Sequence, residues 1–194
     1  MKHGTGVTIP MKIYFVRHGV TRSNVERRSM GQRSDESLLP EGIEQAREIA
    51  EILPRNFDVL LSSPLRRASE TAAIISERHG LPFTTVPELA ERDTGSLSGM
   101  QWDEIANATG GALTLDLVRA VPEHDFSAYG GETKEAFRER LTKFLRETKE
   151  RYGGKKVLTV THAGVLRVLY LLAGGKHPND SEKMGNTSLH EIEF

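Results

Sequence analysis

Three short apolar segments of this 194-residue chain each lead directly into polar or basic residues. The segments and the residues that follow them are 13–16 with Arg17 and His18, 59–61 with Arg67, and 157–160 with His162. Continuous apolar segments of this length, alternating with helical patterns, are typical of parallel strands whose sheet is covered by helices on both faces. We therefore predict an α/β fold, a three-layer α/β/α sandwich around a mostly parallel central sheet.

The polar residues after these strands are expected to meet at one edge of the sheet. Open α/β sheets bind their ligands outside the carboxyl ends of their strands. Two arginines there suit a dense oxyanion, because the planar guanidinium matches phosphate with two parallel hydrogen bonds. Helices that begin just after the strands add backbone N–H donors and a favourable dipole. The sequence therefore predicts a pocket for a phosphate-like anion.

Clustered histidines can also bind a metal ion, which is the rival interpretation of this edge. Zinc ligands usually come as three or four His, Asp or Glu at recognisable spacing, and the arginines within the cluster argue against a cation. The chain has no cysteine, so it can form neither disulfides nor thiolate metal sites. We predict no metal and no cofactor.

Composition favours one globular domain. With 37% hydrophobic and 27% charged residues, the chain can bury a sizeable core. We expect a single domain over residues 11–194, with an irregular insert on the substrate side at about residues 100–131. Residues 1–10 are expected to be a flexible N-terminal extension, with Met11 as the natural start.

Charge and hydropathy limit the partners. A net charge of −1 argues against general nucleic-acid binding, which needs a basic face. The longest apolar stretch, residues 165–173, is interrupted by Arg167 and is far shorter than the ~20 residues of a membrane span, and the first ten residues contain no apolar stretch long enough for a signal peptide. We expect a cytoplasmic protein with a small phosphorylated substrate, and neither a membrane nor a nucleic acid as partner.

Apolar residues at intervals of three and four predict the helices. The predicted helical ranges are 41–53, 102–108, 113–121, 134–151 and 165–173. A further helix is expected to begin with Ser63 as its N-cap and Pro64 at its first position, which puts Arg67 in its first turn. Residues 83–86 and 188–194 are predicted strands, and we expect the second of them to be antiparallel or at an edge.

Several short motifs follow one another along the chain. They are Arg17-His18-Gly19 with Thr21 and Asn24, then Gly31, residues 62–67, Glu91-Arg92, residues 130–133, and residues 161–164. Each motif alone is weak, because three-residue motifs occur by chance. Together and in this order, over most of the chain, they resemble the histidine phosphatase superfamily, also called the phosphoglycerate mutase-like family.

The resemblance implies roles for seven residues. They are His18 as the nucleophile that becomes phosphorylated, Arg17, Arg67 and His162 as ligands of the phosphoryl oxygens, Glu91 as the proton donor, and Asn24 and Gly31 as secondary phosphate contacts. Glu91 would protonate the leaving alcohol and then activate the water that hydrolyses phosphohistidine. Imidazole, with an ordinary pKa of about 6.5, is largely neutral at neutral pH, so one ring nitrogen can attack phosphorus when the other is held as a donor.

Two segments separate the members of this family. Its phosphoglycerate mutases tend to follow the catalytic glutamate with Arg-His-Tyr-Gly and to carry an adjacent arginine pair in the insert, whereas this chain has Asp93 and Thr94 there and only Arg119 in the insert. The resemblance therefore favours a phosphomonoesterase that hydrolyses a small phosphorylated metabolite through a phosphohistidine intermediate. The alternatives are a cofactor-dependent phosphoglycerate mutase-type phosphotransferase and a non-catalytic phosphate-binding regulatory domain.

Other residues have a structural and a functional interpretation. Gly19 is expected to let the backbone approach the ligand, and Gly164 to let a strand and a helix pack closely. Glu132 either supports the start of the following helix or lies near the substrate, and His124 could approach the substrate. The apolar residues of the insert either line the pocket or pack onto the domain: Trp102, Leu113, Leu117, Phe126 and Tyr129.

Overall fold

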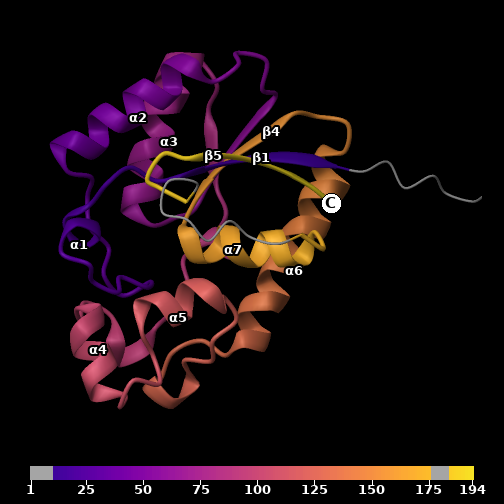
Figure 1. Ribbon diagram of the computed structural model, residues 1–194. Coiled ribbons are helices and arrows are strands. Elements are labelled where there is room, and N and C mark those ends of the chain that lie inside the picture. Colours follow the sequence, from indigo (N-terminus) through magenta and orange to yellow (C-terminus); the bar gives the residue numbers. More distant parts are fainter. Residues whose placement is uncertain (1–10, 176–183) are drawn as a thin grey trace, which may run out of the picture.

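The computed structural model describes residues 11–175 and 184–194, so the predicted extension, residues 1–10, lies outside the described residues. A five-stranded sheet forms its centre (Figure 1), in the order β3-β2-β4-β1-β5. The strands are β1 (Lys12–Arg17), β2 (Val59–Ser62), β3 (Phe83–Thr85), β4 (Val157–Thr161) and β5 (Leu189–Glu193). Strands β1 to β4 are parallel, and β5 pairs antiparallel with β1 at an edge. The predicted mostly parallel sheet and its antiparallel edge strand are confirmed.

Helices connect the strands and cover the sheet (Figure 1). In the described residues they are α1 (Arg22–Val25), α2 (Pro40–Ile52), α3 (Arg66–His79), α4 (Trp102–Ala108), α5 (Leu115–Ala120), α6 (Lys134–Tyr152) and α7 (Ala163–Leu172), with 3-10 turns at Pro87–Leu89, Gly95–Leu97 and Ser127–Tyr129. The predicted helices are confirmed, although several begin or end one or two residues away from the predicted position.

The core consists of two apolar layers, one on each face of the sheet. Alternate residues of a strand point to opposite faces. In β1, Phe15 packs with the residues of α6 and α7, whereas Val16 packs with those of α2 and α3. All residues of β4 are buried, because this strand lies at the centre of the sheet between β1 and β2. The result is the predicted three-layer arrangement of helices, sheet and helices.

The order of the strands places three carboxyl ends side by side. Strand β4 lies between β1 and β2 and is parallel to both. Arg17 of β1 pairs with Thr161 of β4, and Ser62 of β2 pairs with Val160. The residues that follow these strands therefore start from neighbouring positions at one edge of the sheet, which is where open α/β sheets bind ligands.

The insert has an apolar cluster of its own and lies over this edge. Helices α4 and α5 pack around a cluster made of Leu97, Ile105, Leu113 and Phe126. Backbone hydrogen bonds tie the segment after α1 to the insert: the N–H of Trp102 donates to the carbonyl of Arg27 (3.1 Å), and the N–H of Ser29 donates to that of Met100 (2.9 Å). The insert is thus attached to the chain that leaves β1.

The prediction that Ser63 and Pro64 open α3 is wrong. The helix begins after Leu65, which is its N-cap. The hydroxyl of Ser63 is used elsewhere, because its Oγ lies 2.7 Å from Nε2 of His162 and accepts the N–H of Leu65 at 3.2 Å. Arg67 nevertheless lies in the first turn, as predicted.

Candidate active site

The structure brings His18, His162, Arg17 and Arg67 together at the carboxyl edge of the sheet. The ring centroids of His18 and His162 are 5.1 Å apart. His18 follows β1, His162 is the N-cap of α7 directly after β4, and Arg67 lies in the first turn of α3 after β2. The side chains of all three are buried. The topology of the sheet therefore accounts for their convergence.

Hydrogen bonding fixes the position of the proton on the His18 ring. Nδ1 lies 2.7 Å from the carbonyl oxygen of Gly19. Because a carbonyl oxygen only accepts, Nδ1 must carry the proton and donate it. Burial, together with the charges of Arg67 and Arg17, lowers the pKa of His18 well below its ordinary value. Nε2 therefore keeps a free lone pair at neutral pH.

His162 is a buried neighbour of His18 and is not among the residues that line the cavity described below. Its Nε2 lies 2.7 Å from Oγ of Ser63, and its Nδ1 is buried without a hydrogen-bond partner among the described residues. Burial, together with Arg67 and His18, lowers the pKa of His162 well below its ordinary value. At neutral pH the ring is therefore uncharged.

Backbone carbonyl groups hold Arg17 and Arg67. Nη1 of Arg17 donates to the carbonyl of Met184 (2.6 Å), and the guanidinium of Arg67 donates to the carbonyls of Gly31 (3.0 Å) and Ser34 (3.1 Å). Nε of each arginine is buried without a partner among the described residues. Burial lowers the pKa of Arg17 to about 10, which still leaves it charged at neutral pH. Both arginines thus keep donors and positive charge.

Two backbone N–H groups hold the carboxylate of Glu91. Oε1 accepts the N–H of Arg92 (2.9 Å), and Oε2 accepts the N–H of Gly164 (3.0 Å) in the first turn of α7. Arg140 holds the backbone, because its Nη2 donates to the carbonyl of Glu91 (3.1 Å). A Cβ atom on Gly164 would collide with the Glu91 carboxylate. The expectation that Gly164 serves strand-to-helix packing is therefore wrong, since this glycine makes room for Glu91.

Asn24 and Gly31 both line the cavity. Oδ1 of Asn24 accepts the backbone N–H of Thr21 (3.1 Å) and a hydrogen bond from Nδ2 of Asn186 (3.1 Å). The amide NH₂ of Asn24 is therefore the group left to bind an anion. Gly31 has a φ of +53°, and its carbonyl holds Arg67.

The structure gives Gly19 a different purpose from the expected one. Gly19 is not among the residues that line the cavity. A Cβ atom on Gly19 would collide with the carbonyl of Gly42, and one on Gly42 would collide with the carbonyl of Val20. The two glycines therefore let α2 approach the chain just after His18, so the close contact is with a helix and not with a ligand.

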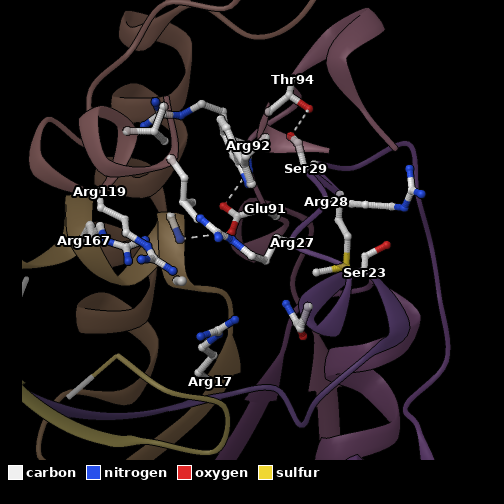
Figure 2. A pocket seen from close by; sticks show the side chains of 18 of the residues that line it. Arg17, Ser23, Arg27, Arg28, Ser29, Glu91, Arg92, Thr94, Arg119 and Arg167 are labelled. Atoms are coloured by element: carbon white, nitrogen blue, oxygen red, sulfur yellow. Dashed lines mark hydrogen bonds between the residues drawn. The ribbon is translucent and has the colours of Figure 1, made fainter. Parts of the chain in front are cut away.

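A cavity of about 360 Å³ lies between these groups and the insert (Figure 2). Among the residues that the structure describes, seven arginines and a single acidic residue, Glu91, line it. Sequence reasoning missed Arg27, Arg28, Arg167 and Asn186 as lining residues. The sequence could have indicated Arg167, because this charged residue interrupts an otherwise apolar helix. Arg27 and Arg28 follow a four-residue helix and Asn186 lies just before β5, where apolar periodicity carries no information.

The apolar residues of the insert divide between the two interpretations. Trp102 and Phe126 line the cavity. Leu113 is buried in the apolar cluster of the insert and Tyr129 packs against it, whereas Leu117 is exposed. The lining interpretation therefore holds for Trp102 and Phe126.

Glu132 and His124 are not among the lining residues. The carboxylate of Glu132 pairs with Arg140 of α6 at 2.7 Å, with both side chains mostly buried. Glu132 therefore supports the following helix. Nε2 of His124 lies 3.3 Å from the carbonyl of Leu117, and the carbonyl of His124 accepts a hydrogen bond from Arg92 (3.0 Å). Both residues thus help to attach the insert.

Within residues 11–175 and 184–194, no three His, Asp or Glu side chains lie together as metal ligands. None of the helices described for this chain is long and apolar enough to cross a membrane.

The fold and the site define an α/β protein with a pair of neutral histidines among arginines at the carboxyl edge of a mostly parallel sheet. The sequence matches the family model of the histidine phosphatase superfamily (branch 1) over residues 13–194, and the chain belongs to that superfamily. Its relatives include proteins named as phosphatases and as phosphoglycerate mutases.

Three relatives illustrate this similarity. The chain is 32% identical to the uncharacterized phosphatase PhoE of Bacillus subtilis, over 94% of this chain and 88% of the relative. It is 35% identical to a metal-independent phosphoserine phosphatase of Arabidopsis thaliana, over 82% of this chain and 67% of the relative. A mycobacterial glucosyl-3-phosphoglycerate phosphatase, solved with VO3, has a similar structure, with a TM-score of 0.79, 28% identity, and coverage of 93% of this chain and 91% of that one.

Proposed function

We propose that this protein hydrolyses a small phosphomonoester through a phosphohistidine formed at His18. The observation that carries the proposal is a pair of buried N–H donors beside one neutral imidazole, Nε of Arg17 and Nε of Arg67, neither of which has a partner among the described residues. Buried polar groups are nearly always hydrogen-bonded. A phosphoryl group, with three oxygens and negative charge, would satisfy such donors.

In the first step, the lone pair of Nε2 of His18 attacks phosphorus as the bond from phosphorus to the alcohol oxygen breaks. Glu91 gives its proton to the leaving oxygen, so the alcohol departs neutral. The backbone bonds of Glu91 occupy one lone-pair position on each of its oxygens, which leaves a position for that proton. Arg17 and Arg67 offset the charge on the phosphoryl oxygens.

In the second step, the Glu91 carboxylate takes a proton from water as the water oxygen attacks phosphorus. The bond from phosphorus to Nε2 breaks, its electron pair returns to His18, and inorganic phosphate leaves. Glu91 then holds the proton that the next cycle needs. Asn24 and Gly31 are proposed as secondary phosphate contacts, because both line the cavity.

The reaction is proposed to need no metal ion. The guanidinium groups supply the positive charge that a metal would otherwise supply to the phosphoryl group. The similarity to a relative named metal-independent phosphoserine phosphatase supports a reaction without a metal ion. The mutase alternative differs only in the acceptor of the phosphoryl group, which is then a second substrate molecule in place of water.

Hydrolysis of p-nitrophenyl phosphate and of a panel of phosphorylated metabolites tests the proposal. We expect phosphate release that is unchanged by a chelator such as EDTA. The panel includes 3-phosphoglycerate with its bisphosphate primer, which separates the two reactions. Conversion of 3-phosphoglycerate to its isomer without phosphate release would favour the mutase, and binding without any turnover would favour a regulatory domain.

A further inference from the structure

The cavity carries more positive charge than one phosphoryl group needs. Arg17 and Arg67 are already assigned to the phosphoryl group. Within the described ranges 11–175 and 184–194, five further arginines and a single acid line the same cavity, in a chain whose net charge is only −1. They are Arg27, Arg28, Arg92, Arg119 and Arg167. Positive charge is therefore concentrated at this site.

Two of the five arginines have partners within the protein. Arg28 pairs with the carboxylate of Glu26 at 2.7 Å and donates to the carbonyl of Gly99 (2.8 Å). Arg92 donates to backbone carbonyls of the insert, and its guanidinium lies over the ring of Phe137, 4.1 Å from the centroid. These two arginines serve to attach the insert.

The side chains of the other three, Arg27, Arg119 and Arg167, make no hydrogen bond or ion pair with any residue that the structure describes. Nε of Arg167 is buried, in the first turns of α7. Figure 2 shows Arg119 and Arg167 next to each other on one side of the pocket, with Arg17 below them. Burial lowers the pKa of Arg167; the charge of Glu91 raises this pKa in part, and the charge of Arg119 lowers it. Two like charges thus lie side by side, and Glu91 is the only acidic side chain that lines the cavity among the described residues.

Arg27 occupies a strained position. Its φ is +54°, in the left-handed region that glycine and asparagine adopt far more readily than arginine. The backbone is held there by the insert, because the carbonyl of Arg27 accepts the N–H of Trp102 at 3.1 Å. Backbone strain of this kind is common at active sites and ligand-binding sites. Here it places an arginine on the cavity wall.

We propose that Arg27, Arg119 and Arg167 form a second anion subsite, and that the substrate is a small phosphomonoester carrying a second anionic group, a carboxylate or another phosphate. This inference rests on the phosphoryl site of the proposed function. The cavity, at about 360 Å³, has room for a carbon skeleton between the two anionic ends. Trp102, Val118 and other apolar residues on the wall are suited to pack against that skeleton.

The test is ligand selectivity, measured by calorimetry in a His18→Ala background so that nothing turns over. In one arm, 3-phosphoglycerate is compared with glycerol 3-phosphate, which has a hydroxymethyl group in place of the carboxylate. In the other arm, propane-1,3-diol bisphosphate is compared with the monophosphate. We expect the ligand with two anionic groups to bind about tenfold or more tightly than its partner in at least one arm, which also identifies the second group.

Arg119→Ala, Arg167→Met and Arg27→Asn should each lower that ratio of affinities severalfold toward one. Asparagine tolerates the left-handed backbone, so Arg27→Asn removes the charge without adding strain. Arg47→Ala is the matched control, because Arg47 is an exposed arginine of α2 that pairs with Glu44, and the ratio should stay at its original value. Equal losses for both ligands of a pair, or no preference in either arm, would overturn the subsite.

The proposed function fails by a different result. If the wild-type protein hydrolyses no phosphomonoester but binds the ligand with two anionic groups selectively, the hydrolytic function is overturned and the subsite is supported. If the protein hydrolyses p-nitrophenyl phosphate through His18 but shows no preference for the ligand with two anionic groups, the function is supported and the subsite is overturned.

Discussion

At the scale of single residues, the pocket combines neutral imidazoles with charged guanidiniums. Burial and the charges of Arg67 and Arg17 lower the pKa of His18, and its hydrogen bond to the Gly19 carbonyl leaves Nε2 without a proton. The same two arginines are suited to offset the charge of a phosphoryl group. One set of positive charges therefore keeps the proposed nucleophile unprotonated and attracts its target.

Glu91→Gln should separate good leaving groups from poor ones. An alkyl alcohol leaves poorly as an alkoxide and needs a proton, whereas p-nitrophenolate is already a stable anion. In single-turnover measurements the variant should slow phosphorylation by an alkyl phosphate at least about tenfold more than phosphorylation by p-nitrophenyl phosphate.

Glu88→Gln is the control for this variant, because Glu88 is close in sequence and pairs with Lys143 of α6 at 2.5 Å. Its rates should depend on the leaving group as those of the wild-type protein do. If Glu91→Gln slows both substrates equally, Glu91 only positions the phosphate, and His162 becomes the next candidate for the acid.

The sequence was sufficient to predict the site residues that follow a strand. It was not sufficient to predict the other residues that line the cavity. His18, His162 and Arg67 could be placed together because parallel strands end at one edge. Arg27 and Arg119 belong to a turn and to an irregular insert, and long-range hydrogen bonds and the apolar packing of the insert bring them to the cavity. Their contribution depends on tertiary contacts that no local pattern records.

At the scale of elements, the first turn of α7 and the loop around Glu91 fit each other. Gly164 supplies the N–H that holds Oε2 of Glu91 and lacks the Cβ that would displace it. Asp93 fixes the same loop, through a two-point pair with Arg33 (2.9 and 3.0 Å) and a bond from the N–H of Gly95 (2.9 Å). The loop is therefore held at both of its ends.

Gly164→Ala should displace the Glu91 carboxylate with little effect on folding. Alanine is favoured over glycine in a helix by up to about 1 kcal/mol, so the free energy of unfolding in urea should change by less than about 2 kcal/mol. A displacement of about 1 Å at a catalytic group costs about a hundredfold, so kcat/KM for an alkyl phosphate should fall by about ten- to a hundredfold.

Gly175→Ala makes the same substitution just beyond α7, where a Cβ atom would have ordinary contacts. It should leave both kcat/KM and the unfolding free energy close to their wild-type values. Wild-type activity of Gly164→Ala would show that the carboxylate has room that the structure does not indicate, and the proposed role of this glycine would be wrong.

The long elements could be predicted because their apolar patterns are strong, and the start of α3 could not. In α6, Phe137, Leu141 and Phe144 recur at helical spacing and are buried. Ser63 and Pro64 carry a local signal for a helix start, but a hydrogen bond to His162, far away in sequence, takes the Ser63 hydroxyl. Tertiary contacts thus override capping signals at the site itself.

At the scale of the whole molecule, the residues just before β5, from the far end of the chain, contact the site. Met184 binds Arg17 through its carbonyl, and Asn186 donates to Asn24. His190 anchors this segment, because its Nε2 lies 2.8 Å from Oγ of Ser188 and its Nδ1 lies 3.0 Å from the hydroxyl of Tyr170. Residues 184–190 therefore connect the pocket to the edge strand β5.

The molecule should lose stability as the pH falls from about 6.5 to 4. Burial, with a smaller effect of Arg17, lowers the pKa of His190 to about 4, whereas an unfolded histidine has a pKa of about 6.5. Between these values the unfolded state binds the extra proton, so acid favours unfolding, and the stabilisation is fully present only above about pH 6.5. His190 alone should account for about 2 kcal/mol between pH 7 and pH 5.

Urea unfolding of His190→Gln at these two pH values measures that contribution. The variant should lose about 2 kcal/mol less than the wild-type protein on acidification. Tyr170→Phe, which removes the hydroxyl partner of Nδ1 but keeps the imidazole, should retain most of the pH dependence. If His190→Gln keeps the full wild-type pH dependence, the histidine does not titrate as its burial implies.

Trapping the phosphoryl group on the protein tests the central claim most directly. The wild-type protein is mixed with substrate, quenched in alkali to preserve acid-labile phosphohistidine, and digested for mass spectrometry. The proposed mechanism predicts one phosphate on Nε2 of His18, formed within a single turnover, and no such label or hydrolysis in His18→Ala. A phosphate on another residue, or hydrolysis that survives in His18→Ala, would contradict it.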